Sequence, residues 1–555
     1  MSRRVAATIC VFLVYGSVVF AQSRKAIVLD ADSKSVAVVD AAAGTVGERA
    51  TLADAPLRMI LSPDSKRIAV LSRGEGTTSF WTSHFNPTSK SALTLIDAAT
   101  MKQIARVELG WDVGRASFSA DSGTLTVLTP GVVSNKPAEV KPAEMIRINA
   151  RTGEVLKRTP LDRAAGAFEI SSNGETGAIF FKSSGHSMSQ VRLIDIATLD
   201  RIADITLSGA TDAPVALIKD NLYLVDNSKA KAGKMYIVSL ADRKLATTLD
   251  VGDKPIVGAV DPDRGNIYLL NDNDELRIVN GMTLSAPVKV ADNPVTVRFT
   301  DDKKTAYVIS NGAVTTVDLT KMTASPSIKV SHSSSDFAIS PDGRRGFVLH
   351  RSDQFCCRAT VIDMTNGTNM KSFLTGSKGA RIAAGLAAAA ATVGSYQAGR
   401  SAAQSRGGGT FYYTAYTPRI AKAARGPLAI RPDGKFAYYL DVQTSDVTIV
   451  DAESGERLKN VSVGSGGHEL VMLANGKYLA AVSDASVTII DTDSNEMKTE
   501  VKLSGDVADF AVSPKGDYAA VIGKGKIAVI DARTAAQVAS FDAFKRPTQF
   551  IFLAD

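Results

Sequence analysis

A short apolar strand that ends in an acid, an amide or a hydroxyl recurs along the chain. Typical copies are Val36-Ala-Val-Val-Asp40 and Val487-Thr-Ile-Ile-Asp491. The eleven copies end at Asp40, Asp97, Asn149, Asp195, Ser239, Asn280, Asp318, Asp363, Asp451, Asp491 and Asp531. Neighbouring copies are 38 to 57 residues apart, except for one interval of 88 residues. β-Branched strands repeated with a period near 40 predict an array of four-stranded units.

A second kind of turn lies between two other apolar strands of each unit. Examples are Ser62-Pro-Asp-Ser, Ser340-Pro-Asp-Gly and Arg431-Pro-Asp-Gly. Pro presets the first turn dihedral and Gly or Asp tolerates the left-handed position, so these segments predict tight reversals. The strand before this turn is called the first strand of its unit, the one after it the second. The recurring motif strand is the third, and a fourth follows it.

The motif strands, the Pro-Asp turns and the approach from Gly252 to Pro255 resemble β-propellers of the YVTN type, as found in exported bacterial proteins. The resemblance covers nearly the whole mature chain. It implies an all-β propeller of about eleven four-stranded blades. It implies little about function, because such propellers resemble one another through structural residues.

The ends of the repeat array predict how the propeller closes. The array begins with a second strand, Ala26–Leu29, and finishes with a first strand, Thr548–Leu553. We expect these strands to share one blade, which removes free sheet edges. Eleven blades exceed the usual number of about four to eight per ring. Two rings are therefore expected in preference to one, with residues 22–311 forming the first part and residues 312–555 the second.

Residues 1–21 are typical of a secretory signal. Arg3 and Arg4 precede the apolar run Val5–Phe20, and cleavage is expected after Ala21. An uncleaved anchor is the alternative, but a run of about 16 residues is short for a membrane span. The mature protein is expected to be exported to the periplasm or the extracellular space, without a transmembrane span.

The positive charge is concentrated in one segment. The formal charge is +7, and the insertion 376–426 contains seven Lys and Arg residues without Asp or Glu. The basic balance therefore does not predict nucleic-acid binding. Cations beside aromatic residues such as Tyr412 and Tyr413 suit an anionic partner, either a cell-envelope polymer or another protein. A solvated loop is the alternative.

The long connections all belong to one face of the predicted propeller. They are residues 73–91, 130–144, 183–189, 227–234, 350–358 and 376–426. Loops on a rigid scaffold often carry function, so this face is expected to bind the partner. Its candidate residues are Trp81, His84, Trp111, His186, His332, His350, Tyr412, Tyr413 and His468. Polar residues of the first strands are expected at the channel mouth, where they bind a ligand or only hold water. They are Arg58, Arg115, Thr296, Asp336, Glu469, Asp509 and Gln549.

Catalytic and cofactor motifs are missing from the sequence. It has no Cys-x-x-Cys-His haem motif, nucleophile elbow, zinc-protease motif or phosphate loop. Asp261-x-Asp263-x-Gly265 and Asp491-x-Asp493-x-Asn495 resemble fragments of calcium loops, but both are interpreted as blade turns. The recurring motif residue, whether Asp, Asn or Ser, is interpreted as a turn cap in all eleven copies. No cofactor or metal is expected.

Cys356 and Cys357 are the only cysteines left after signal cleavage, and they are adjacent in a long loop. The sequence leaves three states of this pair open, namely reduced thiols, an intermolecular bridge and a vicinal disulfide. The sequence as a whole favours an exported, non-enzymatic propeller that binds a protein or an envelope polymer through its long-loop face. The alternative is a hydrolase or lactonase with its site at the channel mouth.

Overall fold

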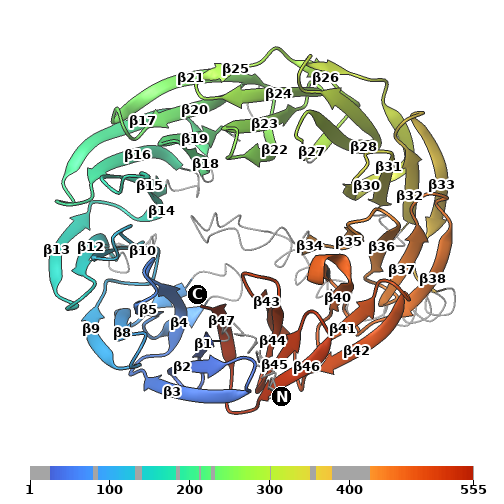
Figure 1. Ribbon diagram of the computed structural model, residues 1–555. Coiled ribbons are helices and arrows are strands. Elements are labelled where there is room, and N and C mark those ends of the chain that lie inside the picture. Colours follow the sequence, from blue (N-terminus) through green and yellow to red (C-terminus); the bar gives the residue numbers. More distant parts are fainter. Residues whose placement is uncertain are drawn as a thin grey trace, which may run out of the picture.

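The computed structural model describes residues 25–78, 85–131, 141–182, 188–211, 214–226, 232–300, 302–350, 358–377 and 425–553. Within these ranges the chain forms antiparallel strands grouped into eleven blades around a ring (Figure 1). The prediction of an all-β propeller with eleven four-stranded blades is confirmed. These ranges contain no helix of the length and hydropathy needed to cross a membrane.

The first strands line the inside of the ring and the second strands lie behind them (Figure 1). The first strands are β4 (Pro56–Leu61), β10 (Ala116–Phe118), β14 (Ala165–Ile170), β18 (Pro214–Ile218), β22 (Ile256–Asp261), β27 (Pro294–Phe299), the second half of β30 (Ile328–Ile339), β35 (Leu428–Ile430), β39 (Glu469–Leu473), β43 (Val507–Val512) and β47 (Pro547–Phe552). The second strands are β1 (Lys25–Asp30), β5 (Arg67–Ser72), β11 (Thr124–Thr129), β15 (Thr176–Lys182), β19 (Asn221–Val225), β23 (Asn266–Asn271), the first half of β28 (Thr305–Asp318), β31 (Arg345–His350), β36 (Phe436–Asp441), β40 (Tyr478–Val482) and β44 (Tyr518–Gly523).

The third and fourth strands complete each blade toward the rim. The third strands are β2 (Ser35–Asp40), β8 (Ala92–Asp97), β12 (Ala143–Asn149), β16 (Met188–Asp195), β20 (Gly233–Ser239), β24 (Glu275–Asn280), the second half of β28, β32 (Arg358–Asp363), β37 (Asp446–Asp451), β41 (Ser486–Asp491) and β45 (Lys526–Asp531). The fourth strands are β3 (Thr45–Thr51), β9 (Gln103–Glu108), β13 (Val155–Leu161), β17 (Arg201–Thr211), β21 (Lys244–Gly252), β25 with β26 (Thr283–Leu284 and Val288–Lys289), β29 (Thr323–Ala324) with the first half of β30, β33 (Thr368–Leu374), β38 (Arg457–Ser462), β42 (Glu496–Lys502) and β46 (Ala536–Phe541).

Three short elements lie outside this plan. The hairpin of β6 (Gly76–Thr78) and β7 (Phe85–Pro87) lies in the connection from β5 to β8. β34 (Arg425–Gly426) adds to the inner edge of β39, and a 3-10 turn, η2 (Ala474–Gly476), joins β39 to β40. The blades are numbered here along the chain, so that blade 1 contains β1 and blade 11 contains β43.

The hydrophobic core shows that the blades close one ring. The described residues form eleven buried clusters, and each cluster lies between two neighbouring blades. The last joint is the cluster between blades 11 and 1, which includes Val529 and Val28. The expectation of two rings is therefore wrong. It rested on the usual blade number, whereas side-chain volume between the blades sets the angle at which they meet, and a strand repeat does not encode that angle.

Alternate residues of the middle strands face opposite neighbours. In β5, Ile68 and Val70 pack toward blade 1, while Ala69 and Leu71 pack toward blade 3. Successive side chains of a strand point to opposite faces of its sheet, and here both faces are covered. This is why the second and third strands are almost continuously apolar, whereas outer strands such as β3 are largely exposed.

The predicted shared blade is confirmed. β47 pairs antiparallel with β1 and completes the sheet β47-β1-β2-β3. Phe550 and Phe552 from β47 are 4% and 6% exposed in the core between blades 11 and 1. The Asp30 carboxylate at the end of β1 also accepts hydrogen bonds from the N–H groups of Lys545 and Arg546, at 2.8 and 2.9 Å.

The recurring motif residue caps the turn after the third strand in ten of its eleven copies. The Asp97 carboxylate accepts hydrogen bonds from the N–H groups of Ala99 and Thr100 at 3.1 and 2.9 Å. The other nine caps are Asp40, Asn149, Asp195, Ser239, Asp318, Asp363, Asp451, Asp491 and Asp531. The expected cap at Asn280 is wrong. The turn after β24 contains only two residues, and the Asn280 amide instead donates to Arg264 O and Asn266 Oδ1.

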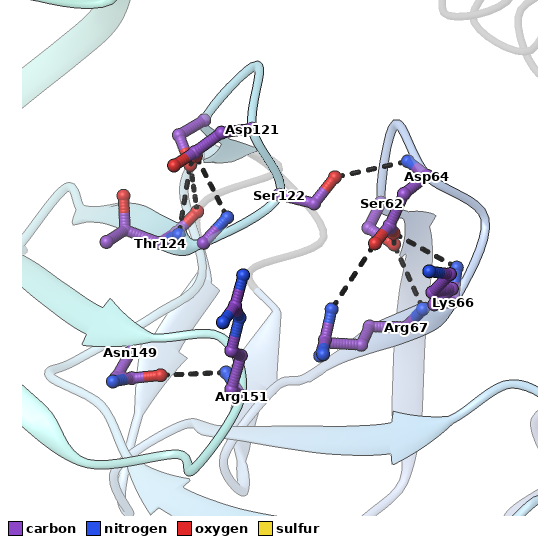
Figure 2. Close-up of polar contacts among 11 residues, drawn as sticks. Ser62, Asp64, Lys66, Arg67, Asp121, Ser122, Thr124, Asn149 and Arg151 are labelled. Carbon is purple, nitrogen blue, oxygen red and sulfur yellow. Dashed lines mark hydrogen bonds and ion pairs between the residues drawn. The ribbon is translucent and has the colours of Figure 1, made fainter.

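A second cap stabilises the turn between the first and second strands. In blade 2, Ser62 Oγ accepts a hydrogen bond from Arg67 N–H and donates to the Asp64 carboxylate, which accepts from Lys66 N–H. Figure 2 shows this turn beside that of blade 3, whose Ser122 Oγ accepts from Asp64 N–H at 3.1 Å. The same pair of a hydroxyl and an acid or amide two residues later occurs at Ser119/Asp121, Ser171/Asn173, Thr300/Asp302 and Ser340/Asp342.

Candidate binding surfaces

The two faces of the ring differ in the connections that they carry. The face with the turns between first and second strands and between third and fourth strands is called the short-turn face. Its described turns contain five residues or fewer. The opposite face, called the long-loop face, carries the remaining connections, among them those from β5 to β8, from β11 to β12 and from β33 to β35. The predicted one-sided distribution of long connections is confirmed.

Trp111 lies on the long-loop face, in the connection between β9 and β10. Its ring is half-buried, and Lys141 Nζ lies 4.4 Å from the ring centroid. Next to it, Arg73 Nε donates to Asp112 Oδ1 at 2.8 Å, which joins two connections of this face. The described residues therefore include one aromatic side chain that is partly covered by a cation at this face.

The described histidines differ in accessibility. His468 is exposed just before β39, and its Nδ1 lies 3.2 Å from Gly466 O. His350 is 1% exposed at the end of β31, and its Nε2 lies 2.8 Å from Thr360 Oγ1. His332 belongs to β30, on the connection between blades 7 and 8. His350 is thus placed inside the structure, whereas His468 lies on the surface of the long-loop face.

His350 belongs to a set of buried polar residues that the sequence analysis did not separate out. They are the residues at the long-loop ends of the second strands. Its members are Asp30, Ser72, Thr129, Asp226, Asn271, Ser310, His350, Asp441 and Ser483. Several of them hydrogen-bond to neighbouring connections, as Asn271 Nδ2 does to Val251 O at 3.2 Å. The sequence signal for this set is a polar residue at the end of an otherwise apolar second strand.

One of these ends, Asp441, and Asp446 at the start of β37 hold the start of the insertion. Thr375 Oγ1 donates to the Asp441 carboxylate at 2.9 Å, and Ser377 N–H donates to the Asp446 carboxylate at 2.8 Å. At the other end, Arg425–Gly426 pairs with β39 of blade 10. β35 then resumes blade 9. The insertion therefore leaves and re-enters the ring on its long-loop side, with both ends bonded to the scaffold.

Most of the first-strand polar residues contact the neighbouring blade. Arg115 donates to Phe168 O at 2.7 Å and forms an ion pair with Glu169. Gln549 bonds to both backbone groups of Met59, at 2.9 and 3.1 Å. Three further contacts join Arg58 to Gly114 O, Thr296 to Gly258 O and Arg298 to Asp336. Asp509 instead accepts from Phe510 N–H within its own strand, at 2.8 Å. Glu469 begins β39 and is half-buried.

Two carboxylates of this inner wall are shielded from solvent, since Glu169 is buried and Asp336 is half-buried. Burial raises the pKa of Glu169 above its usual value, although the Arg115 guanidinium opposes the shift. Burial likewise raises the pKa of Asp336, against the opposing effect of Arg298. In both ion pairs one first strand is joined to the next. The geometry therefore supports a structural role for Arg115, which the sequence placed among the ligand candidates.

Bulges near the start of the first strands change which side chains face outward. Eight first strands carry one, including those at Leu57 and Val295. These two apolar side chains are 47% and 49% exposed. A bulge redirects neighbouring side chains, and sequence periodicity alone did not locate it.

The calcium-like sequence Asp261-x-Asp263-x-Gly265 forms a blade turn, as interpreted. Lys303 from blade 7 places its Nζ 2.6 Å from the Asp261 carboxylate and 3.5 Å from that of Asp263. A lysine ammonium thus neutralises both carboxylates. In the described part of the chain, no group of three or more His, Cys, Asp or Glu side chains could hold a metal ion.

Several candidates lie outside the described residues. They are the signal segment 1–21, Trp81, His84, His186, Cys356, Cys357, Tyr412 and Tyr413. The expectations for signal cleavage, the state of the two cysteines and ligand binding by these residues stay predictions.

Comparison with known proteins adds no family. No model of a protein family matches the chain, and no curated protein matches it. Among solved structures, the chain is similar to the hydrazine synthase of Kuenenia stuttgartiensis, at 17% identity, over 57% of this chain and 94% of that chain, with a TM-score of 0.31. It is also similar to the dihydro-heme d1 dehydrogenase NirN in complex with DHE, at 13% identity, over 64% and 73% of the two chains, with a TM-score of 0.33. A eukaryotic initiation factor matches at 10% identity, over 87% and 97% of the two chains, with a TM-score of 0.41.

These likenesses are too low to carry an argument about activity or ligand. The resemblance to the YVTN type stays a prediction, since no family model matches. The fold assignment rests on the chain's own strands and inter-blade clusters, which define an eleven-bladed β-propeller.

Proposed function

We propose that this chain is an exported, non-enzymatic propeller that binds a protein or an anionic cell-envelope polymer through its long-loop face. The observation that supports this proposal most is the one-sided distribution of long connections. The short-turn face uses turns of five residues or fewer, many of them capped, whereas the long-loop face carries the connections between β5 and β8 and between β33 and β35. Variable loops on a rigid scaffold are the usual place for recognition.

Charge supports an anionic partner. The insertion 376–426 supplies seven cations and no acid, and its described ends are bonded to Asp441, Asp446 and β39. Because both ends of this cationic segment are bonded to the scaffold, its charges belong to the face from which it emerges. Trp111 and Lys141 add an aromatic surface and a further cation to the same face.

Retention on an anionic matrix tests the proposal. The probe is alginate, a linear polycarboxylate, coupled to a column, and the protein is the chain from Gln22 to Asp555. The wild type should be retained at low salt and released at high salt, because exposed charges are screened beyond about 10 Å at 0.1 M. A variant with residues 378–424 replaced by a short Gly-Ser linker should lose retention.

The matched control removes cations from the opposite face. Lys66→Gln, Lys102→Gln and Lys435→Gln change three exposed lysines of the short-turn face. This triple variant should still be retained at low salt, with at most the small decrease that its lower net charge causes. The proposal would be contradicted if the linker variant were retained as strongly as the wild type, or if only the control variant lost retention.

A further inference from the structure

The inner wall of the central channel carries an apolar patch where blades 6 and 7 meet. Ile256 and Val257 in β22 and Val295 in β27 are between 37% and 49% exposed. The two strands lie side by side, since Thr296 Oγ1 donates to Gly258 O at 3.3 Å. Single exposed apolar side chains are ordinary on a protein surface, but a continuous apolar patch marks a surface that packs against another segment.

The direction of β34 shows where the insertion returns to the ring. β34 adds to the inner edge of β39, so it lies on the channel side of blade 10 (Figure 1). First strands run from the long-loop face to the short-turn face, and β34 is antiparallel to β39. Arg425 pairs with Val471, the middle residue of β39, and Gly426 pairs with Leu470. The start of β34 therefore points into the channel and not above the long-loop face.

The segment that leads to β34 is long enough to reach the patch. It follows Ser377 and precedes Arg425. At about 3.3–3.6 Å per extended residue, residues 378–424 can span on the order of 150 Å, whereas a folded chain of this length has a radius of gyration of about 24 Å. The segment also contains the run Ile382–Val393, which is rich in Ala and has no charged residue.

We propose that the apolar run 382–393 of the insertion docks on the inner wall of the channel, against Ile256, Val257 and Val295. The contact removes apolar surface of both partners from water, which stabilises it. All cations of the insertion stand outside this run, so docking does not use the charges on which the proposed function depends. The contact goes beyond the function proposed above and does not depend on it.

The reactivity of a cysteine placed in the patch tests the docking. In the chain from Gln22 to Asp555 with Cys356→Ser and Cys357→Ser, Val295→Cys puts one thiol on the inner wall. Its rate of reaction with N-ethylmaleimide is compared with the rate in the same chain after residues 378–424 are replaced by a short Gly-Ser linker. Removal of the segment should raise the rate at least tenfold, and equal rates would overturn the proposal.

A cysteine on the outer rim provides the matched control. Met497 is 53% exposed and belongs to β42, a fourth strand on the side of its blade away from the channel. Met497→Cys should react at the same rate with and without the segment. A similar rise at both positions would show that the whole ring had loosened and would contradict the docking.

Substitutions inside the segment test the apolar run without deleting it. Ile382→Asp with Leu386→Asp places two charges in the run and should also raise the rate at position 295 at least tenfold. Ser395→Asp with Ser401→Asp adds the same charge outside the run and should leave the rate unchanged. Equal effects of the two pairs would contradict a role for the run. Protection at position 295 should be independent of protein concentration, and protection that grows with concentration would assign the patch to a second copy and overturn the proposal.

Discussion

The long-loop and short-turn faces of the ring are built from the same strands but are joined by different rules. On the short-turn face, ten motif residues cap turns of five residues or fewer, and neighbouring turns contact one another, as Asp64 and Ser122 do in Figure 2. On the long-loop face, nine second strands finish at a buried polar residue, and the connections of this face range from two residues to the one that contains the insertion 376–426. One face therefore keeps the length of its turns nearly constant, whereas the connections on the other face vary in length.

The largest expected effect comes from opening the ring. Deleting Pro547–Leu553 removes β47 and exposes the edge of β1. It also removes Phe550 and Phe552 from the core, and loss of one such side chain costs about 3–5 kcal/mol. We expect aggregation or loss of cooperative thermal unfolding. Removal of only the last two residues is the control, and unchanged unfolding of the longer deletion would show that β47 does not close the ring.

The next prediction changes the length of one connection on each face. Inserting Gly-Ser between Ala452 and Glu453 breaks the turn in which Ser454 N–H donates to Asp451 at 2.8 Å. This should lower the free energy of unfolding by about 1–2 kcal/mol, the usual cost of losing a cap. Replacing residues 378–424 by a short linker should change it by less than about 1 kcal/mol, because closure entropy varies slowly with loop length. Urea unfolding measures both, and a reversed order would contradict the comparison.

A smaller effect is expected for single side chains. Asp97→Ala removes the cap on Ala99 and Thr100 and should cost about 0.5–2 kcal/mol. Asp54→Ala on the long-loop face removes an exposed ion pair with Arg106, whose atoms lie 2.7 and 3.0 Å apart, and should cost about 0.2–1 kcal/mol. Urea unfolding midpoints distinguish the two. Equal losses would mean that the caps contribute no more than surface ion pairs.

The smallest effect concerns pH. Hydrogen bonds from Thr320 and Lys321 lower the pKa of Asp318 to about 2, so its contribution to stability is present above its unfolded-state pKa and is lost as the pH falls toward 2. Asp318→Asn should therefore flatten the acid side of the stability profile.

Burial raises the pKa of Glu169, so its effect on stability changes with pH in the opposite direction to that of Asp318. Its ionisation disfavours the folded state, and this penalty grows as the pH rises from the usual Glu pKa through the raised one. Glu169→Gln should remove this decrease. Unfolding measured from pH 2 to pH 8 checks both variants, and parallel profiles for wild type and variants would refute the assignment.

The sequence was sufficient where local chemistry decides the structure. The motif strands and their turn residues predicted the eleven blades, and the pairing of β1 with β47 followed from which strand types began and finished the repeat. The cap at Asn280 was wrong because the turn after β24 is two residues shorter than the pattern assumed, which leaves no N–H group in position.

Packing between residues far apart in the chain could be predicted less well from the sequence. The ring number was wrong because it depends on the angle between blades, set by side chains from different repeats such as Val28 and Val529. The burial of His350 was also missed, since a histidine at a strand end reads as a surface residue until Thr360 and the neighbouring blade are placed. The inter-blade roles of Arg115 and Gln549 were hidden for the same reason.

Blocking each face in turn tests the proposed division most directly. In a Cys356→Ser/Cys357→Ser background of the chain from Gln22 to Asp555, His468→Cys places one thiol on the long-loop face and Lys66→Cys places one on the short-turn face. Each is coupled to a polyethylene glycol maleimide, and binding to alginate is measured before and after coupling. Polyethylene glycol at position 468 should lower the affinity for alginate at least tenfold, whereas polyethylene glycol at position 66 should change it little. Unchanged binding with polyethylene glycol at position 468, together with loss at position 66, would contradict the proposed division.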